Sequence, residues 1–450
     1  MGDMSEDDRR SAAEPSTLEK VREGEAVVGV IGLGYVGLPL AEAFGRAGFP
    51  IMGFDIDPDK VERLNQGRSY IKQVSDESLS ALRDDELFEA TSDFDRLCEP
   101  DCILVCVPTP LRESREPNMS YVRRTAEDIG QALRPEQLVV LESTTYPGTT
   151  RELLLPILEE PGLEVEEDFY LAYSPEREDP GHPDHTVSYT PKVVGGIGEK
   201  SLEVARELYE AVAPSVVEVS SAACAEATKL LENVYRAVNI ALVNELKVVL
   251  DDMEVDIWEV VDAASTKPFG FQPFYPGPGW GGHCIPIDPF FLSWKARQFG
   301  TTAHFIQRAG EVNTAMTDFV TRKITEGLNL HRKPVNGSDI LVLGVAYKPD
   351  VDDMRETPAL PLIDRLRNMG ADVSYHDPHI PAFPSLRDYP ELNLESVELT
   401  ADRLEESDAV VVVTDHSDYD FSWVASHATL VVDTRNCVPD EAEGTTLIRA

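Results

Sequence analysis

The chain reads Ala26-Val27-Val28-Gly29-Val30-Ile31-Gly32-Leu33-Gly34-Tyr35-Val36-Gly37 near its start. The first six of these residues predict a buried parallel strand, and the last six follow the pattern Gly-x-Gly-x-x-Gly. Helical periodicity follows over 38–47, and a second apolar run over 49–54 ends at Asp55, 18 residues after Gly37. Strand, glycine turn, helix, strand and acid in this order predict a dinucleotide-binding βαβ unit, with a turn that binds no cofactor as the alternative.

Each residue type in this unit has a physical role in holding a dinucleotide. Gly32 permits a tight turn, Gly34 leaves room for the pyrophosphate, and Gly37 lets helix and strand pack closely. The helix N-terminus presents N–H groups and positive potential to the phosphates. Asp55 can accept hydrogen bonds from both ribose hydroxyls and would repel a 2′-phosphate, so NAD is favoured over NADP. The residues expected to bind the cofactor here are Gly32, Gly34, Tyr35, Val36, Gly37 and Asp55.

Three further apolar runs predict buried strands that end in polar or proline-containing loops. These runs span 102–107, 138–142 and 169–173. Because ligands of parallel sheets bind at the carboxyl ends of the strands, we expect Thr109, Thr144 and Glu176, which follow the three runs, to point into one crevice. A role as helix N-caps or first-turn acids is the alternative for such residues.

A second chemical motif is Gly277-Pro278-Gly279-Trp280-Gly281-Gly282-His283-Cys284-Ile285-Pro286-Ile287-Asp288. Glycines at this density let a backbone approach a ligand closely, and a cysteine held there can act as a nucleophile. A glycine-rich surface turn with a buried thiol is the alternative. The chain has six cysteines without CxxC pairs, which predicts no metal site and favours a reducing cytoplasm.

A long helical pattern without Gly or Pro runs from Ala222 to Asp251. Lys229 and Asn233 are four residues apart and therefore share one face of this helix. They are either functional groups or plain solvated surface, or Lys229 forms an ion pair with Glu226. A helix of this length spans about 45 Å, which suits a spine between two domains or a dimer interface.

The predicted fold class is α/β, with two Rossmann-like doubly wound domains joined by this long central helix. We expect a disordered acidic lead-in over 1–24, an NAD-binding domain over 25–220 and a central helical domain with the cysteine loop over 221–333. A second α/β domain over 334–450 lacks Gly-x-Gly-x-x-Gly, so it could bind a nucleotide or serve oligomerisation.

The charge is strongly acidic, with 81 Asp and Glu against 40 Lys and Arg, a net charge of −41. Such a surface argues against binding a nucleic-acid backbone or an anionic membrane, and no apolar run is long enough for a transmembrane helix. The acids are dispersed along the whole chain. This dispersion favours adaptation to concentrated salt, as in a halophile, over an ordinary acidic protein.

Taken together, the motifs resemble the UDP-sugar 6-dehydrogenase family, which includes UDP-glucose dehydrogenase, over roughly residues 26–440. The resemblance rests on motifs in the same order. They are Gly32 to Pro39, Val107 to Pro110, Ser143-Thr144, Pro175-Glu176, Lys229 with Asn233, Gly281 to Asp288, Ala346 to Pro349 and Asp352 to Glu356. A cytoplasmic enzyme, either a homodimer or a higher homo-oligomer, is the corresponding expectation.

The resemblance implies a four-electron oxidation of a sugar CH2OH to a carboxylate with two NAD. Cys284 matches the family's nucleophile, which forms a thiohemiacetal and then a thioester. The remaining matched positions each have an implied role. Lys229 and Asn233 stabilise an oxyanion, Glu176 and Thr144 position or activate water, Asp288 acts as a base or orients Lys229, Lys348 contacts the UDP phosphate, and Arg355 contacts phosphate on the cofactor side.

The run Phe274 to Gly279 resembles the UDP-N-acetylglucosamine members of the branch that acts on UDP-N-acetylhexosamines. That branch as a whole is also resembled in two departures from the glucose branch. They are Pro175-Glu176-Arg177 followed by Pro180-Gly181, and His283 before Cys284. Whether Lys267 replaces the arginine of the glucose branch is open. The implied substrate contacts are Arg177, Lys229, Asn233, Tyr275, Gly281 and Lys348. UDP-glucose and UDP-N-acetylmannosamine are the alternative substrates, and a non-catalytic NAD-binding scaffold is the alternative of another class.

Overall fold

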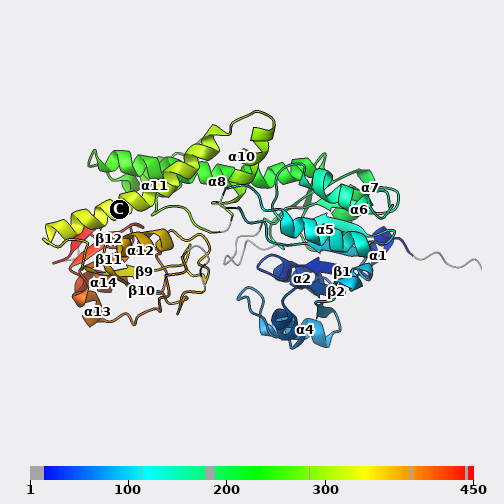
Figure 1. The fold of residues 1–450 in the computed structure, drawn as a ribbon, viewed down its shortest axis with the longest axis horizontal. Helices are drawn as coiled ribbons and strands as arrows, with labels where there is room; N and C mark the ends of the chain where they lie inside the picture. The colour runs from blue at the N-terminus through cyan, green and yellow to red at the C-terminus, as the bar shows by residue number, and fades with distance from the viewer. Residues whose placement is uncertain are drawn as a thin grey trace, which may run out of the picture. The chain divides into compact units, whose positions relative to one another are not determined.

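The computed structural model describes residues 15–112, 114–177, 188–282, 284–384, 386, 389–440 and 444–450. The chain separates into two compact units, Met1–Leu230 and Leu231–Ala450, each an α/β structure (Figure 1). No described helix has both the length and the apolar character that crossing a membrane requires.

The first unit is built on an eight-stranded sheet in the order β3-β2-β1-β4-β5-β6-β7-β8. Its neighbouring strands are parallel except for β6 and β7. Every residue of β1, β2, β4 and β5 is buried, which explains why these strands read as uninterrupted apolar runs. The strands are β1 Val28–Ile31, β2 Ile51–Phe54, β3 Phe88–Thr91, β4 Cys102–Val105, β5 Leu138–Leu141, β6 Tyr170–Tyr173, β7 Lys192–Gly196 and β8 Val216–Glu218.

Helices pack against this sheet on both faces (Figure 1). They are α1 Thr17–Glu23, α2 Gly37–Arg46, α3 Pro58–Asn65, α4 Asp76–Asp84, α5 Ser120–Ala132, α6 Leu155–Glu159 and α7 Glu199–Glu210, with single turns η2 Phe94–Cys98 and η3 Thr150–Leu154. The apolar residues of the sheet and helices form two hydrophobic clusters, so the sheet lies in the centre of the unit.

The expectation of a disordered lead-in over 1–24 is wrong for Thr17–Glu23, which forms α1. Ser16 and Glu19 form a capping box at its start, and Gly24 ends it at φ 74°. Val21 is buried, and the Thr17 hydroxyl donates to the Glu136 carbonyl. The capping box and these two contacts therefore hold a short helix in place within a polar segment. Residues 1–14 of the expected lead-in lie outside the described residues.

The second unit holds a five-stranded parallel sheet in the order β10-β9-β11-β12-β13. Its strands are β9 Asp339–Leu343, β10 Asp372–His376, β11 Ala409–Val412, β12 Leu430–Asp433 and β13 Thr446–Arg449. Its helices are α9 Ile257–Ser265, α10 Asp288–Gln298, α11 His304–Leu330, α12 Ala359–Asn368, α13 Ala401–Glu406 and α14 Phe421–His427.

The long helix α8, Ala222–Asp251, links the two units in sequence and has the bounds that the sequence predicts. The predicted fold class, two α/β sheets joined by a long central helix, is confirmed. The apolar residues of α8 are only partly buried, because Leu231, Leu242 and Leu246 are exposed while Leu230 and Ala241 are covered.

Candidate active site

The turn between β1 and α2 has the geometry that a dinucleotide requires. Gly32 has φ 89°, and a Cβ there would lie 2.7 Å from the Cys106 carbonyl oxygen. A Cβ on Gly37 would lie 2.0 Å from the Gly32 carbonyl oxygen, so this contact of helix and strand admits only glycine. A Cβ on Gly34 would meet no atom within 4 Å, which leaves open space beside the start of α2 for a pyrophosphate.

Asp55 follows β2 and anchors this turn from the neighbouring strand. Its Oδ2 accepts the Leu33 N–H at 3.0 Å, and its Oδ1 accepts the Asp57 N–H at 3.0 Å. Each carboxylate oxygen has a second lone pair, so the same side chain could still accept ribose hydroxyls. Tyr35 is exposed at the tip of the turn, and Val36 precedes the first residue of α2. These residues fit a bound NAD.

Thr109, Thr144 and Glu176 follow β4, β5 and β6, which are neighbours in the sheet. Thr109 is buried and Thr144 is half-buried. The Glu176 Oε1 accepts the Arg177 N–H at 2.5 Å, and Arg177 in turn donates to the Pro191 carbonyl at 2.6 Å. The turn after β6 is therefore ordered up to residue 177, whereas the predicted Pro180-Gly181 turn lies outside the described residues.

Sequence reasoning missed a buried ionic network directly beneath Glu176. Lys192, the first residue of β7, places its Nζ 2.7 Å from Glu142 Oε2 and 3.6 Å from Glu176 Oε2. Tyr209 on α7 donates its hydroxyl to Glu142 Oε1. The only signals in the sequence are a lysine and a glutamate at the ends of otherwise apolar strand segments.

The face of α8 predicted to be functional is buried rather than solvated. Asn233 is 6% exposed and donates its Nδ2 to Asp288 Oδ2 at 2.6 Å. Lys229 is also buried, and the alternative pairing with Glu226 is not formed, because Glu226 accepts the N–H and the hydroxyl of Thr150 at 2.8 and 2.7 Å. Burial is the main reason that the pKa of Glu226 rises to about 7.

The cysteine loop is fixed at the start of α10. Asp288 is 2% exposed, and its N–H donates to the Cys284 carbonyl at 2.8 Å. The thiol residue Cys284 itself is exposed, so the alternative of a buried thiol is wrong. Asn233 and Asp288 therefore hold one side of the loop while Cys284 remains accessible. His283, singled out in the sequence, lies outside the described residues.

Two glycines bring the cysteine loop against the loop that follows β9. A Cβ on Gly281 would lie 3.0 Å from Tyr347 Cβ, and one on Gly282 would lie 2.9 Å from the Tyr347 ring. The Gly282 N–H also donates to the Arg355 carbonyl at 3.2 Å. Cys284 and Lys348 are thus carried by loops that touch each other within the second unit.

An open pocket of about 310 Å³ lies between these two loops. Its lining includes Gly279, Trp280, Arg355 and Glu356. The Arg355 guanidinium forms two short bonds to Asp353, of 2.9 and 2.7 Å to Oδ2, which orient it at the rim. A pocket with a fixed guanidinium at its rim suits an anionic ligand such as a phosphate, and Lys348 does not belong to its lining.

Tyr275 and Lys267 lie elsewhere on the central segment. The Tyr275 ring stacks on Trp258 of α9 at 5.5 Å, and its hydroxyl donates to Asp262 at 2.7 Å. The Lys267 ammonium lies over the Phe269 ring at 5.1 Å. The predicted substrate roles of these two residues stay predictions.

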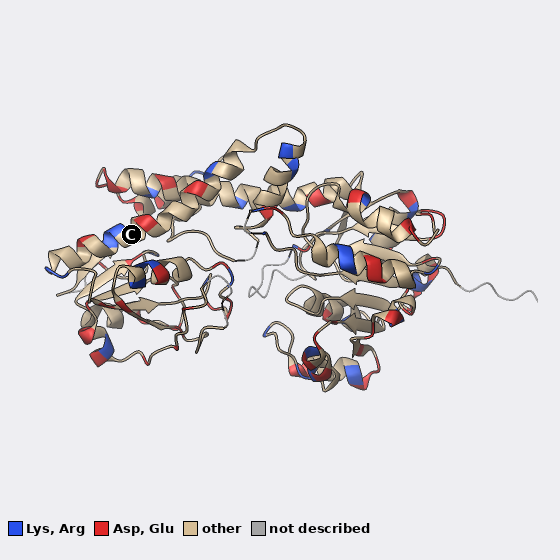
Figure 2. Cartoon of the chain, in the orientation of Figure 1, with Lys and Arg blue, Asp and Glu red and all other residues tan. Residues whose placement is uncertain are grey.

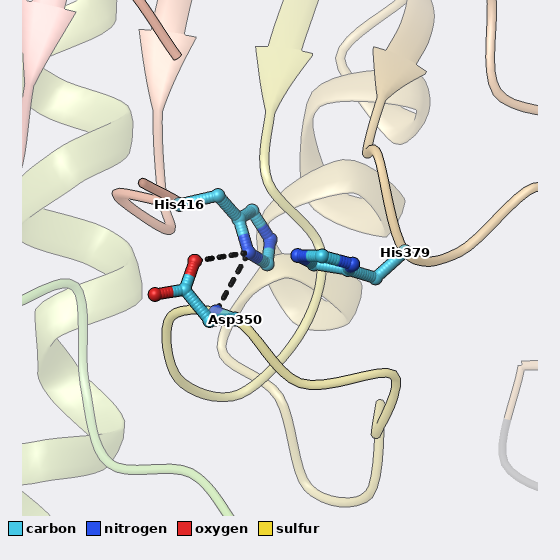
Figure 3. Close-up of side chains that lie close together, drawn as sticks. All are labelled: Asp350, His379 and His416. Carbon is cyan, nitrogen blue, oxygen red and sulfur yellow. Dashed lines mark hydrogen bonds and ion pairs between the residues drawn. The ribbon is translucent and has the colours of Figure 1, made fainter. Parts of the chain in front are cut away.

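Asp350, His379 and His416 form a cluster whose metal-ligating atoms lie within 4.8 Å of one another (Figure 3). His416 Nδ1 accepts the Asp350 N–H at 2.9 Å, which leaves Nε2 to donate to Asp377 Oδ2 at 3.0 Å. A ring nitrogen has one lone pair, so Nδ1 cannot also bind a metal ion in this arrangement. The cluster instead ties the loop of Lys348 to the loop after β11.

Asp377 completes this tie by accepting the N–H groups of Val345 at 2.7 Å and Ala346 at 3.2 Å. Burial alone would raise the pKa of Asp377, but the hydrogen bonds from His416 and the backbone outweigh it and lower the pKa. An ionised aspartate thus holds both the histidine and the turn after β9.

Three family models match the chain in order. They are the NAD binding domain of the UDP-glucose/GDP-mannose dehydrogenase family over 26–213, its central domain over 223–315 and its UDP binding domain over 341–440. These segments contain the glycine turn, the cysteine loop and the Lys348 loop, respectively.

Characterised relatives match over most of their length. UDP-N-acetyl-D-glucosamine 6-dehydrogenase of Pseudomonas aeruginosa is 35% identical over 80% of this chain and 85% of its own. UDP-N-acetyl-D-mannosamine dehydrogenase of Pyrococcus horikoshii is 31% identical over 93% of this chain and 97% of its own. The solved structure of UDP-D-ManNAc dehydrogenase from Pyrococcus horikoshii covers 94% of this chain and 98% of its own, with a TM-score of 0.85 at 29% identity. Relatives with different substrates match about equally well.

Proposed function

The chain belongs to the UDP-glucose/GDP-mannose dehydrogenase family, and from this premise we propose that it oxidises C6 of UDP-N-acetylglucosamine to the carboxylate with two NAD. The family assignment establishes an NAD-dependent UDP-sugar dehydrogenase. The identity of the sugar and the roles of individual residues are the proposal.

The observation that supports the proposal most is the contact of Gly281 and Gly282 with Tyr347. It places an accessible cysteine on a loop that touches the loop of Lys348. Lys348 binding the UDP phosphate would therefore bring the far end of a nucleotide sugar toward Cys284. A purely structural glycine turn would need neither the exposed thiol nor the neighbouring lysine.

The glycine turn and Asp55 would hold NAD, which would supply the hydride acceptor for both oxidation steps. Between these steps the Cys284 sulfur adds to the C6 aldehyde, and the second oxidation leaves C6 as a thioester of the enzyme. Water then adds to the thioester carbonyl, the C–S bond breaks, and the thiolate leaves. Overall, one alcohol, one water and two NAD⁺ give one carboxylate, two NADH and three protons.

The remaining residues stabilise charge and move protons in this scheme. Lys229 and the Asn233 amide donate to the developing oxyanion at C6. Asp288 orients Asn233 through their 2.6 Å hydrogen bond. Glu176 accepts a proton from the hydrolytic water, and Thr144 positions that water.

The choice of UDP-N-acetylglucosamine over UDP-glucose rests on Arg177 and on His283 before the cysteine. We expect kcat/KM to be at least about tenfold higher for UDP-N-acetylglucosamine, a difference of about 1.4 kcal/mol. Initial rates with UDP-N-acetylglucosamine, UDP-N-acetylmannosamine and UDP-glucose test this choice. Equal rates, or a preference for either of the other two sugars, would refute it.

The covalent scheme has its own test. We expect two NADH for each sugar consumed, and Cys284→Ser should lose turnover to the acid while its NAD affinity stays within about twofold. One NADH per sugar, with free aldehyde as the end product, would refute the scheme while leaving the family assignment intact.

A homodimer through α8 is part of the proposal. Its exposed apolar residues recur at helical spacing, and such a face needs a partner. They are Leu231, Tyr235, Leu242, Leu246 and Val249. Sedimentation equilibrium should give twice the mass of one chain, and Leu242→Glu with Leu246→Glu should halve it.

A further inference from the structure

Lys192 is a buried cation surrounded by acceptors. Its side chain is 2% exposed, and its ammonium contacts Glu142 Oε2 at 2.7 Å, the Pro175 carbonyl at 3.1 Å and Glu176 Oε2 at 3.6 Å. Burying an ammonium group costs several kcal/mol unless it is paired and hydrogen-bonded. Two hydrogen bonds, to Glu142 and to the Pro175 carbonyl, and an ion pair with Glu176 meet that condition.

The charges of the network determine which group is ionised. Burial alone would lower the pKa of Lys192, but Glu142 and Glu176 outweigh it and raise the pKa, so the lysine stays a cation. Burial raises the pKa of Tyr209 well above its usual range, so its hydroxyl keeps the proton that it donates to Glu142. Glu142 is 0% exposed, and these two donors satisfy its oxygens.

The consequence for Glu176 is a carboxylate oriented from both sides. Lys192 lies at Oε2, while the Arg177 N–H donates to Oε1 at 2.5 Å. Lys192 also bonds the carbonyl of the preceding residue, Pro175, so the same ammonium fixes the backbone turn that carries Glu176. β7 runs antiparallel to β6, so the start of β7 lies beside the residues that follow the end of β6. This brings Lys192 next to Glu176 although the two are distant along the chain.

We propose that Lys192 is a positioning residue for thioester hydrolysis, acting through Glu176; this inference rests on the proposed function. In that step water adds to the thioester carbonyl, its proton passes to the Glu176 carboxylate, and the C–S bond breaks to release the Cys284 thiolate. Lys192 transfers no proton itself. It holds the Glu176 carboxylate in one orientation, and Glu142 with Tyr209 balances its charge.

The test removes Lys192 without leaving a buried charge behind. Lys192→Met alone would leave the buried Glu142 carboxylate without its counter-charge, which is strongly destabilising. The charge-balanced variant is therefore Lys192→Met with Glu142→Gln, which retains a side chain able to bond Tyr209. Lys192→Arg retains a cation beside Glu176, and Lys200→Gln removes an exposed lysine on α7 as a matched control.

Rapid mixing with NAD and a UDP-sugar substrate separates oxidation from hydrolysis. For the charge-balanced variant we expect a burst of two NADH per active site at the wild-type rate, then a steady-state rate at least about tenfold lower. Mass spectrometry of the intact chain should show Cys284 acylated by C6 of the sugar nucleotide. Lys200→Gln should keep the steady-state rate within about threefold of wild type, and Lys192→Arg, which retains a cation, should lose less of that rate than the charge-balanced variant.

Three outcomes overturn the inference. The first is an unchanged steady-state rate in the charge-balanced variant, and the second is an equal loss of burst and steady-state rates, which a merely structural lysine would give. If that variant fails to fold, Lys192→Arg decides, and an equal loss of burst and steady-state rates in it is the third. Absence of NADH formation by the wild type with every UDP-sugar would instead contradict the proposed function.

Discussion

The two sheets place an aspartate at the same position and surround it differently. Asp55 follows β2, the neighbour of β1, and accepts the Leu33 N–H from the turn after β1. Asp377 follows β10, the neighbour of β9, and accepts the N–H groups of Val345 and Ala346 from the turn after β9. Both aspartates hold the turn of the adjacent strand.

The difference lies in what occupies the space next to each turn. Gly34 in the first turn faces open space, and α2 begins three residues later. In the second turn, Gly344 directly follows β9 and is as crowded as Gly32, with a Cβ 2.3 Å from the Thr414 carbonyl oxygen. The position that corresponds to Gly34 is Ala346, which is buried and whose carbonyl accepts the Thr414 hydroxyl at 2.6 Å. The first turn can therefore receive a pyrophosphate at a helix start, whereas the second is closed by the buried Ala346 and by Thr414 from the loop after β11.

This contrast explains how one architecture serves two nucleotides. A helix N-terminus binds phosphate only while its N–H groups are accessible. The second sheet has lost that opening, and its next helix, α12, starts only at Ala359. The intervening loop carries Lys348 and Arg355, so side-chain cations can replace the helix start as phosphate ligands.

The largest effect that tests the contrast is expected in the first turn. Gly37→Ala places a methyl group 2.0 Å from the Gly32 carbonyl oxygen, so we expect a loss of at least about 3 kcal/mol in the free energy of unfolding. Gly34→Ala meets no atom within 4 Å, so it should cost less than about 1 kcal/mol but weaken NAD binding at least about tenfold.

Urea unfolding and NAD titration of both variants measure these effects. Gly344→Ala is the matched control in the second sheet, where we expect lower stability and an NAD affinity within about twofold of wild type, because φ is 77° and Thr414 is in the way. Normal NAD binding by Gly34→Ala would contradict the assignment of the open turn.

A smaller effect is expected at His416, whose two ring nitrogens can be replaced separately. An Asn side-chain oxygen reaches the position of Nδ1, and a Gln side-chain nitrogen reaches that of Nε2. His416→Asn should keep an acceptor for the Asp350 N–H, while His416→Gln should keep a donor to Asp377. If the bond to Asp350 holds the Lys348 loop in place, only His416→Gln weakens UDP binding, by at least about threefold.

Calorimetric titration with UDP checks this difference, and zinc analysis of the purified chain accompanies it. Equal UDP affinities in the two variants would show that the bond to Asp350 does not position the loop. A stoichiometric zinc ion lost on mutating His416 would show that the cluster is a metal site instead.

The most diffuse effect is expected from salt, because Asp and Glu residues are spread over both units (Figure 2). A net charge of −41 repels itself, and the repulsion is screened as the Debye length falls from about 10 to about 3 Å between 0.1 and 1 M salt. We expect the melting temperature and the activity to rise over this range of KCl, and sucrose, which favours burial without screening, to raise the melting temperature less. A flat or falling melting temperature in KCl would contradict salt adaptation.

Local patterns predicted the strands and helices that bury continuous apolar sequence. The run Ala222–Asp251 has no Gly or Pro, and α8 has the same bounds. The alternation of apolar strands with glycine turns likewise indicated both sheets. What the sequence lacked was any sign of pairing between distant polar residues.

Two contacts show why that information was missing. Lys192 and Glu142 are 50 residues apart and meet because β7 joins the sheet antiparallel to β6. Asn233 and Asp288 are 55 residues apart and meet because α10 begins beside α8. Each polar residue looks like an isolated surface group until tertiary packing buries it next to its partner.

The central claim is that the open turn binds NAD and the Lys348 loop binds UDP, and that each nucleotide binds independently of the other site. Calorimetric titration of Asp55→Ala and Lys348→Gln with NAD and with UDP tests it most directly. We predict that Asp55→Ala weakens NAD binding at least about tenfold and leaves the UDP affinity within about twofold, and that Lys348→Gln does the reverse. If either variant lost both affinities together while remaining as stable as wild type, the division of labour between the two sheets would be wrong.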